Sequence, residues 1–573
     1  MVCGKKSKVV MKSTRLISAA AGQWAKAIIV SFSLVIGCVL QAGPIATNPP
    51  GFKIIKPQTG GLSPIVEVGS ITRQGTNVIL DIGGLRGPYS VEKKSDLGLP
   101  WSDTGISADA TRLTVPIVGQ MGFLRVRGQP YNYVGAAVCS MCHTAVHQQW
   151  TNTVHANAYQ TLKNIRMNNN PACVGCHTVG FNSGGYVSET ATPQFLGVQC
   201  ENCHGPAGAH LANPFSIRPI ITQSSMMCGG CHTGSHQPTY DEWTESGHSA
   251  VTPTVANYIN QYGESRMWQC GPCHSGSVRL GILNQLSVTN GTVVMPSRDD
   301  GSSTPITCVV CHDPHQVTAN DPQLRYPLYS TNHYNLSTPT NMATFASQYN
   351  PDVNLCGQCH NLRGGVWNDS SRSPHHSGQY NMLVGTGGWP NNADNSQTIA
   401  THGLGIENQC AHCHTYSVRV SNPTDKNPNY TGHKFEVRFE ACEECHSSAE
   451  IGELLVEGTQ AVISNKIQEV VGLLRNWGVS NAPTTLRNKS GPLAWEYATA
   501  GQLSTVLMST ITNKPPTSSE QALIPNSIKQ ARFNVYLVEH DGSKGVHNAK
   551  YARYLLNVAK TNVLAELAKP PLP

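Results

Sequence analysis

Charged side chains are scarce in this chain, and no cluster of basic residues occurs beyond its first 42 positions. Only 13% of the 573 residues are charged and 39% are hydrophobic, which is little apolar material for a core built from protein alone. Six of the 40 basic residues lie in the first 42 positions, so the remaining 34 (40 − 6) balance the 34 acidic residues. Because no basic surface is expected, nucleic acid is not an expected partner.

The first 42 residues also lack any acidic side chain. An apolar run over residues 27–39 follows six basic residues, Lys5, Lys6, Lys8, Lys12, Arg15 and Lys26. A run of this length is short for a membrane span and typical of an export signal, so we expect a signal peptide over residues 1–42 and a periplasmic or cell-surface location. Two processing sites are open: cleavage after Ala42, or lipidation of Cys38 at the lipobox-like sequence VIGC. Only a lipidated Cys38 would bring the chain into contact with a membrane.

Cysteine and histidine are both absent from residues 43–132. Short runs rich in β-branched residues occur there instead, at residues 78–82, 89–91 and 123–126, and Gly and Pro separate them. This pattern predicts a small β-sandwich-like domain over residues 43–132. Such a domain can serve as a docking module or as a passive spacer.

From residue 139 onward, cysteine is abundant and regularly placed. The pattern Cys-x-x-Cys-His occurs nine times and uses 18 of the 20 cysteines; Cys3 and Cys38 are the other two. In chain order, motifs 1 to 9 are Cys139/Cys142/His143, Cys173/Cys176/His177, Cys200/Cys203/His204, Cys228/Cys231/His232, Cys270/Cys273/His274, Cys308/Cys311/His312, Cys356/Cys359/His360, Cys410/Cys413/His414 and Cys442/Cys445/His446.

The spacing of this pattern has a chemical reason. Two thiols three residues apart lie on one side of a helical turn, where they can add to the two vinyl groups of one haem, and the next residue, His, ligates the iron. A zinc site or a disulfide scaffold does not require a His after every second Cys. The sequence therefore predicts nine covalently attached haems c, with the nine motif His as iron ligands.

Motifs 1 and 4 begin two copies of an internal repeat. In the first copy CHTAVH is followed by WTNTVH, which ends at His155; in the second CHTGSH is followed by WTESGH, which ends at His248. Each copy holds three motifs, and a further His follows the third: His210 in CHGPAGAH and His315 in CHDPH. The pattern predicts a duplicated three-haem module followed by three more haems, with Trp150–His155 and Trp243–His248 as equivalent ligand-bearing turns.

Residues 447–573 contain no motif and show helical periodicity. One predicted helix carries Ile463, Ile467, Val470, Val471 and Leu474 on a single face; a second is expected near residues 528–539 and a third after Asn548. The predicted organisation is a signal peptide (1–42), a β-rich domain (43–132), a nine-haem cytochrome c domain (133–446) and a C-terminal helical segment packed on it (447–573). The expected fold class is a multihaem cytochrome c, mainly α and irregular, in which haem faces replace much of the hydrophobic core.

Several of these runs resemble a known group of proteins. CVGCHTVGF and GVQCENCHGPAGAH, preceded by WTNTVHA, resemble tetrahaem proteins of the cytochrome c-552/c-554 type, which are related to pentahaem nitrite reductase and octahaem hydroxylamine oxidoreductase. The later runs CVVCHDPH, SPHHSGQYNML, THGLGIENQCAHCH, GHKFEVRFEACEECH and EHDGSKGVHNAKYARYLL resemble larger members of that superfamily. The resemblance covers residues 134–570 and implies closely stacked haem pairs with iron held between two imidazoles.

The resemblance also suggests which of the 14 His outside the motifs (23 − 9) are distal ligands. The suggested set is His155, His210, His248, His315, His376, His402, His433 and His547, with His236 as a ninth. His147, His375 and His540 are alternatives to members of this set, whereas His333 and His412 are interpreted as non-ligands.

Two departures from the related enzymes bear on function. The nitrite-reducing members have Lys in place of the motif His at their catalytic haem, and no CxxCK occurs here. The hydroxylamine-oxidising members rely on a Tyr cross-linked to the haem, whereas Tyr497, Tyr536, Tyr551 and Tyr554 are interpreted here as packing residues. No residue therefore marks a catalytic haem.

Two functions are consistent with these features. The first is an electron carrier of respiratory electron transport, whose partners are redox proteins such as other cytochromes or a quinol-linked membrane complex. The second is an oxidoreductase that acts on a small nitrogen or sulfur compound at one five-coordinate haem. The axial ligands of each haem decide between them.

Overall fold

The computed structural model describes six strands between residues 67 and 128, and then residues 132–286, 294–391, 398, 401–501, 503 and 513–573. The predicted signal peptide and both processing sites lie outside these residues. The chain divides into two compact units, Met1–Pro130 with Asn213–Ile220, and Tyr131–Ala212 with Ile221–Pro573. Among the helices in the described ranges, none has both the length and the apolar character needed to cross a bilayer.

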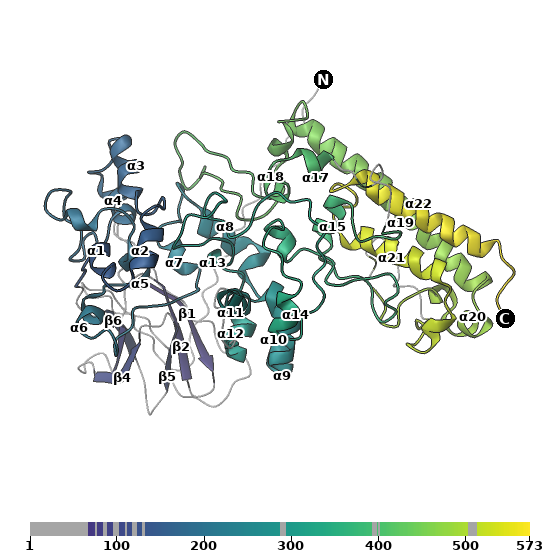
Figure 1. Cartoon of the computed structure of the whole chain (residues 1–573), viewed down its shortest axis with the longest axis horizontal. Coiled ribbons are helices and arrows are strands. Elements are labelled where there is room, and N and C mark those ends of the chain that lie inside the picture. Colours follow the sequence, from purple (N-terminus) through teal and green to yellow (C-terminus); the bar gives the residue numbers. More distant parts are fainter. Residues whose placement is uncertain are drawn as a thin grey trace, which may run out of the picture. The chain divides into compact units, whose positions relative to one another are not determined.

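The first unit contains two three-stranded antiparallel sheets (Figure 1). One has the order β1-β2-β5, from β1 (Glu67–Gln74), β2 (Asn77–Gly83) and β5 (Arg112–Pro116); the other has the order β4-β3-β6, from β4 (Ser102–Ala108), β3 (Tyr89–Lys94) and β6 (Phe123–Gly128). The three strands predicted from sequence are confirmed as β2, β3 and β6. Val78, Ile79 and Leu80 are all buried, so both faces of the central strand β2 are covered. The packing of the two sheets into a sandwich stays a prediction.

In the second unit, every CxxCH motif begins on a short helical turn. The turns are α1 (Ala136–Cys139), α4 (Pro171–His177), α5 (Cys200–His204), α7 (Met226–Gly229), α10 (Glu264–His274), α13 (Cys308–Cys311), η3 (Cys356–Gln358), α18 (Cys410–His414) and η4 (Phe439–Cys442). The amide of the motif His donates to the carbonyl of the first Cys, at 2.9 Å between His143 and Cys139 and 2.7 Å between His446 and Cys442. Residues three apart share one side of such a turn, so both thiols of a motif lie together.

Short helices and loops make up the rest of the motif-bearing region, which confirms the mainly helical and irregular fold. The helices are α2 (Thr144–Trp150), α3 (Ala158–Asn164), η1 (Pro193–Phe195), α6 (Gly208–Ala212), α8 (Thr239–Glu245), η2 (Gly247–Ser249), α9 (Pro253–Tyr262), α11 (Gly276–Leu286), α12 (Arg298–Ser303), α14 (Met342–Ala346), α15 (Gln379–Val384) and α17 (Thr401–Gly405). Two small apolar clusters support them, one around Tyr159 and one around Trp268.

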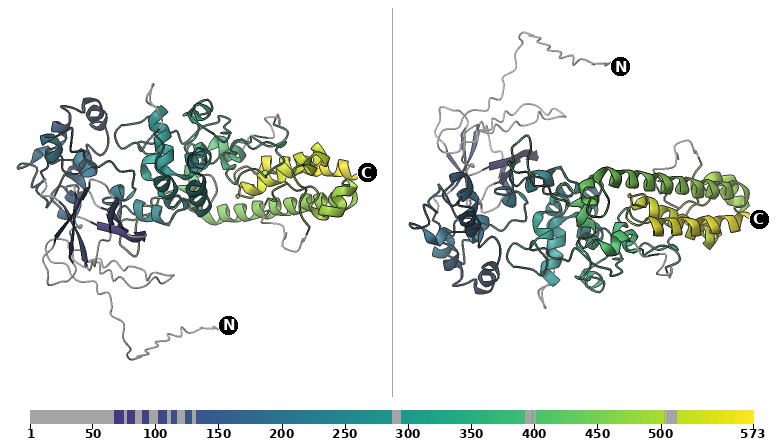
Figure 2. Two further views of the ribbon diagram at one scale, coloured as in Figure 1. Left: turned by 90° about the horizontal axis from the view of Figure 1, so that it is seen from below. Right: turned by 90° about the horizontal axis from the view of Figure 1, so that it is seen from above.

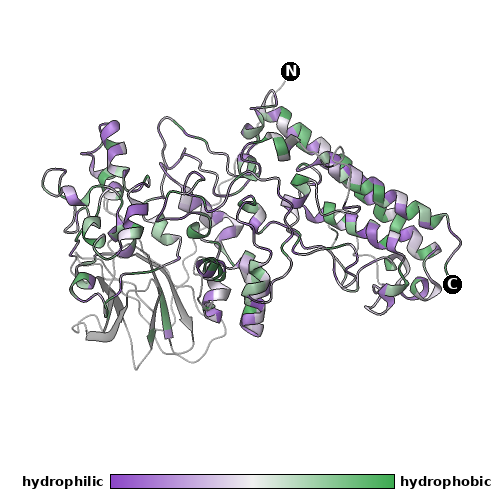
Figure 3. Cartoon of the chain, viewed as in Figure 1, coloured by the Kyte–Doolittle hydropathy of each residue, from purple (hydrophilic) through white to green (hydrophobic). Residues whose placement is uncertain are grey.

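The C-terminal helices form the largest apolar core. The long helix α19 (Ala449–Ser480) packs with α21 (Asn526–His540) and α22 (Ala549–Leu567), and Figure 2 shows the three side by side. The shorter α20 (Thr484–Ser490), η5 (Gly491–Leu493) and η6 (Glu520–Leu523) complete this region. Hydrophilic and hydrophobic residues alternate along the long helices (Figure 3), as expected for helices with one covered face.

The residues predicted for this core are confirmed. The five residues of the predicted face, Ile463, Ile467, Val470, Val471 and Leu474, are all buried in α19. Burial of one such aliphatic side chain contributes about 1.5–3 kcal/mol, so the face is a strong constraint on how α19 packs. Asn548 caps α22 by accepting a hydrogen bond from the Tyr551 amide (2.9 Å). The four C-terminal tyrosines have the predicted packing role, because Tyr497, Tyr536 and Tyr551 belong to the core and Tyr554 packs against it.

Candidate haem-binding centres

Seven motif His face a second His across a gap of nearly constant width. The pairs, with the distance between ring centres, are His143–His210 (6.4 Å), His204–His315 (6.0 Å), His232–His155 (6.1 Å), His274–His375 (6.2 Å), His312–His433 (6.5 Å), His360–His248 (6.2 Å) and His414–His547 (6.3 Å). Imidazoles in direct contact lie much closer, as His376 and His540 do at 3.7 Å.

The width of the gap fits one iron atom between two imidazoles. Metal–nitrogen bonds of about 2 Å on each side, plus about 1 Å from each nitrogen to its ring centre, separate the ring centres by about 6 Å. Each pair contains one motif His, and the two thiols of that motif lie on the adjoining turn. The residues present therefore fit haem c held by two thioethers and two axial imidazoles.

The distal partners agree in large part with the suggested set. Six of its members belong to the seven pairs, namely His155, His210, His248, His315, His433 and His547. The seventh partner is His375, one of the alternatives, whereas its neighbour His376 stacks on His540. Two consecutive residues point apart here, so the geometry favours His375 over His376.

Four other predicted ligands lie outside the seven pairs found among the described residues. His236 is exposed, and His402 directs its Nδ1 to the carbonyl of Val546 (3.1 Å). The motif residues His177 and His446 also belong to none of these pairs. Motifs 2 and 9 thus differ from the other seven at their distal side.

The two repeat copies have the same local structure. The Trp150 indole donates to the carbonyl of Val198 (3.0 Å), and the Val198 amide donates to the carbonyl of His155 (2.9 Å). Trp243 and His248 make the same two bonds, at 3.0 and 3.1 Å, with the residue that stands two positions before motif 6. His155 faces motif 4 and His248 faces motif 7, three motifs further on, so the two turns are equivalent in structure, and their role as iron ligands stays a prediction.

Hydrogen bonds at Nδ1 orient several imidazoles. Backbone carbonyls lie at 2.7 Å from His177, 2.9 Å from His312 and 3.0 Å from His414. An occupied Nδ1 leaves Nε2 for the iron. Burial lowers the pKa of His248 to about 4 and that of His375 to about 3, so both are neutral, which is the ligating form.

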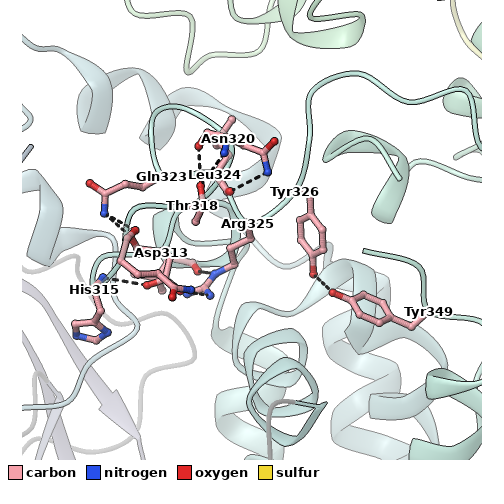
Figure 4. Close-up of polar contacts among 11 residues, drawn as sticks. Asp313, His315, Thr318, Asn320, Gln323, Leu324, Arg325, Tyr326 and Tyr349 are labelled. Carbon is pink, nitrogen blue, oxygen red and sulfur yellow. Dashed lines mark hydrogen bonds and ion pairs between the residues drawn. The ribbon is translucent and has the colours of Figure 1, made fainter. Parts of the chain in front are cut away.

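The loop that carries His315 is braced by polar contacts (Figure 4). Asp313 accepts a hydrogen bond from the His315 amide (2.9 Å) and pairs with Arg325 (2.8 Å). Arg325 in turn donates through Nε to the carbonyl of Val309 inside motif 6 (2.9 Å). The loop is therefore tied to the motif that precedes it, and His315 is presented to a different motif, motif 3.

A buried carboxylate holds the loop that carries His433. Glu242 accepts hydrogen bonds from the amides of Thr431 and His433 and from the Thr431 hydroxyl, all at 2.8 Å. Glu242 is on α8 and lies far from this loop in the sequence. The sequence interpretation missed this residue.

Thiols of different motifs lie close together. The interaction between the neighbouring Cys139 and Cys200 thiols raises the pKa of Cys139 and lowers that of Cys200. The same interaction joins Cys176 with Cys231, Cys228 with Cys308, Cys273 with Cys359 and Cys356 with Cys410. These thiols become thioethers when haem is attached. Their proximity therefore indicates only which motifs lie close together.

Thiol neighbours of two kinds connect all nine motifs. Close pairs of thiols join motif 1 to 3, 2 to 4, 4 to 6, 5 to 7 and 7 to 8. Thiols within electrostatic range join 3 to 4, 6 to 7 and 8 to 9. The result is a line 1-3-4-6-7-8-9 with motif 2 beside 4 and motif 5 beside 7. The links 1–3, 2–4 and 3–4 recur three motifs later as 4–6, 5–7 and 6–7, which matches the repeat.

Two of the predicted haem-binding cysteines differ from the others in exposure. Cys142 of motif 1 and Cys445 of motif 9 are exposed, whereas the other 16 motif cysteines (18 − 2) are half-buried. Motifs 1 and 9 are the two ends of the line, and in each of them the first Cys is the thiol that lies next to another motif. The second Cys is therefore left at the surface. The attachment of all 18 motif cysteines to haem stays a prediction.

All 18 motif cysteines are free of disulfides. Within the described ranges, no group of three or more His, Cys, Asp or Glu side chains is arranged to hold a bare metal ion.

Comparisons with known proteins place part of the chain in a family. Residues 138–205 match the family described as cytochrome c554 and c-prime. Cytochrome c-554 of Nitrosomonas europaea is 41% identical over 90 residues, which is 13% of this chain and 38% of that protein. The matched part thus spans well under half of the relative's length.

Two solved structures are similar over a larger part of the chain. The outer cell wall cytochrome OcwA is 18% identical and has a TM-score of 0.49, with coverage of 75% of this chain and 99% of that chain. An undecahaem cytochrome from the S-layer of Carboxydothermus ferrireducens is 16% identical and has a TM-score of 0.42, with coverage of 76% and 70%. The resemblance deduced from the motifs is confirmed over residues 138–205, which are similar to multihaem cytochromes of the c-554 type.

Proposed function

We propose that the protein is an exported nonahaem cytochrome c that carries electrons along a chain of haems with two axial His. Redox proteins, either other cytochromes or a quinol-linked membrane complex, donate and accept the electrons, and the protein works in the periplasm or at the cell surface. In the sequence, the proposed nine-haem domain (133–446) follows the β-rich domain (43–132) and precedes the C-terminal helical segment (447–573).

The observation that supports this proposal is the series of neighbouring thiols that leads from motif 1 to motif 9, some in close pairs and others within electrostatic range. Electron tunnelling weakens steeply with distance, so a carrier must keep each haem close to the next. Every motif here has a neighbour, and the links repeat with the sequence duplication. The exposed thiols Cys142 and Cys445 belong to the two end motifs, where a partner would exchange electrons with the line. A protein that only used haems to stabilise its fold would not need every motif to be linked to the next.

Each cysteine pair holds one haem, and each motif His supplies the proximal ligand. The distal ligands are the seven partners found opposite motif His, with His375 in place of His376. For motifs 2 and 9, which lack such a partner, His236 and His402 are the candidates that remain from the suggested set. A haem with two axial imidazoles has no open position and is suited to electron transfer.

A pair of variants in one short segment tests the ligand assignment. His155→Ala removes the imidazole opposite His232 (6.1 Å), so one haem should become high spin in the ferric electron paramagnetic resonance spectrum. His147→Ala is the matched control, because His147 lies on the same segment against Trp150 and faces no motif His. An unchanged spectrum in His155→Ala, or the same new signal in both variants, contradicts the proposal.

The second candidate, an oxidoreductase acting on a small nitrogen or sulfur compound, rests on motifs 2 and 9. Neither His177 nor His446 is in the seven pairs, so an open iron position is best sought at these two motifs. Titration of the wild-type protein with nitrite, hydroxylamine and sulfite tests this function. A high-spin signal that one of these compounds converts to low spin supports an enzyme, whereas nine low-spin haems without response support the carrier.

A further inference from the structure

One distal imidazole has a charged partner. Asp541 follows the last residue of α21, and its side chain is fully buried. Its Oδ1 lies 2.6 Å from Nδ1 of His547, and the Ser543 hydroxyl donates to Oδ2. The Ser543 hydroxyl also accepts a hydrogen bond from the His547 amide (3.2 Å). The short loop between α21 and α22 therefore fixes the His547 ring and leaves its Nε2 to face His414.

Neutral groups occupy Nδ1 in the other paired imidazoles for which the described residues show a partner. Backbone carbonyls serve His312, His414 and His433, at 2.9, 3.0 and 3.1 Å. The Ser377 hydroxyl lies 2.8 Å from Nδ1 of His375. Among these Nδ1 partners in the part of the chain that the structure describes, the carboxylate at His547 is the charged one.

A carboxylate acceptor changes the donor strength of an imidazole. It draws the Nδ1 proton toward itself and makes Nε2 a stronger donor, which favours the more highly charged ferric iron over ferrous iron. Asp541 also lies within electrostatic range of Cys410, the first thiol of motif 8, so its negative charge itself stands near this haem. Both effects lower the reduction potential of the haem.

We propose that Asp541 lowers the reduction potential of the haem of motif 8. This rests on the proposed function, in which His547 and His414 are its axial ligands. Motif 8 lies between motifs 7 and 9 on the line of contacts, so every electron that passes between them crosses it. Asp541 thereby controls how fast the last haem exchanges electrons with the others.

The test is a spectroelectrochemical titration of the mature, haem-loaded protein and its Asp541→Asn variant. Asn keeps the shape and an acceptor oxygen but removes the charge. Outer-shell partners typically change metal-site properties about 10- to 100-fold. If that factor applies to the ferric-to-ferrous preference, the potential of one haem rises by about 59 mV per tenfold change, while the others stay in place. Asp541→Glu keeps the charge and should stay near wild type.

Three further variants keep the outcome interpretable. Ser377→Ala removes a neutral Nδ1 partner from His375 and should shift its haem less than Asp541→Asn shifts the haem of motif 8. His547→Ala should make one haem high spin; if it does not, the axial assignment itself is wrong. If His547→Ala opens a haem but Asp541→Asn leaves every potential unchanged with all spectra low spin, the tuning role of Asp541 is overturned. If Asp541→Asn matures poorly, Asp541→Ser serves as a second uncharged variant, and the same rise in reduction potential is expected.

Discussion

Replacing Glu242 with Gln should loosen one distal ligand and leave the other haems as they are. The Glu242 carboxylate accepts three hydrogen bonds from the segment that presents His433 opposite His312, all of them at 2.8 Å. The Gln side chain keeps one acceptor oxygen, and its NH₂ group then faces the Thr431 amide, donor against donor. One bond is lost and the other two are no longer charge-assisted.

The size of the effect follows from the strength of these bonds. A hydrogen bond to a charged acceptor contributes about 1.5–3 kcal/mol, so the change should cost about 2–4 kcal/mol in all. At about 1.4 kcal/mol per factor of ten, detachment of the segment becomes roughly 30- to 700-fold more frequent. The haem of motif 6 is then exposed more often at its distal side.

The rate of cyanide binding to the ferric protein measures this exposure. Glu242→Gln should bind cyanide at one haem much faster than the wild type does, and His433→Ala should leave that haem permanently open. Gln149→Ala is the matched control, because Gln149 stands at the same position of the first repeat copy and is exposed. If His433→Ala opens a haem but Glu242→Gln binds cyanide at the wild-type rate, the carboxylate does not hold the ligand.

Two other predictions concern residues of the C-terminal half. His375→Ala should convert one haem to high spin, whereas His376→Ala should not, because only His375 faces His274 (6.2 Å); the reverse result in the ferric spectra would restore His376 as the ligand. Burial raises the pKa of Glu496 to about 7 from its ordinary 4.5, so the folded state binds this proton more tightly than the unfolded state does. The resulting stability is fully present below pH 4.5 and is lost toward pH 7, at about 1.4 kcal/mol per pH unit. Urea unfolding across this range should show that Glu496→Gln lacks this contribution, and an identical pH dependence in both proteins would be inconsistent with a neutral buried Glu496.

The sequence predicts local features of this protein well. A CxxCH motif is a helical turn by itself, and the α19 face of Ile463, Ile467 and Leu474 follows from its spacing alone. The repeat could also be read directly, because Trp150 and Trp243 stand at equivalent positions and make the same bonds. Each of these features depends on residues that are close in the chain.

The surroundings of a motif are not local in this sense. Cys142 and Cys445 occupy the same motif position as seven other cysteines that are half-buried, yet both are exposed. Their exposure depends on which motifs lie next to motifs 1 and 9 in space. The CxxCH spacing carries no information about that.

The pairing of His with motifs could not be predicted from the sequence either. His547 faces His414 from beyond the longest helix, and nothing local decides between the adjacent His375 and His376. The sequence interpretation also missed the residues that hold a distal His in place, such as Glu242. The sequence does contain a signal for Glu242. The repeat places a neutral Gln149 at the equivalent position of the first copy, so the carboxylate at position 242 indicates a function that Gln149 does not have.

The number of haems tests the account most directly. Every Cys after residue 38 belongs to a CxxCH motif, so intact mass spectrometry of protein matured in a host that attaches haem c should show nine added haems. Nine is the value that a continuous line through all the motifs requires. A count of seven or fewer would contradict it, because at least two motifs would then carry no haem.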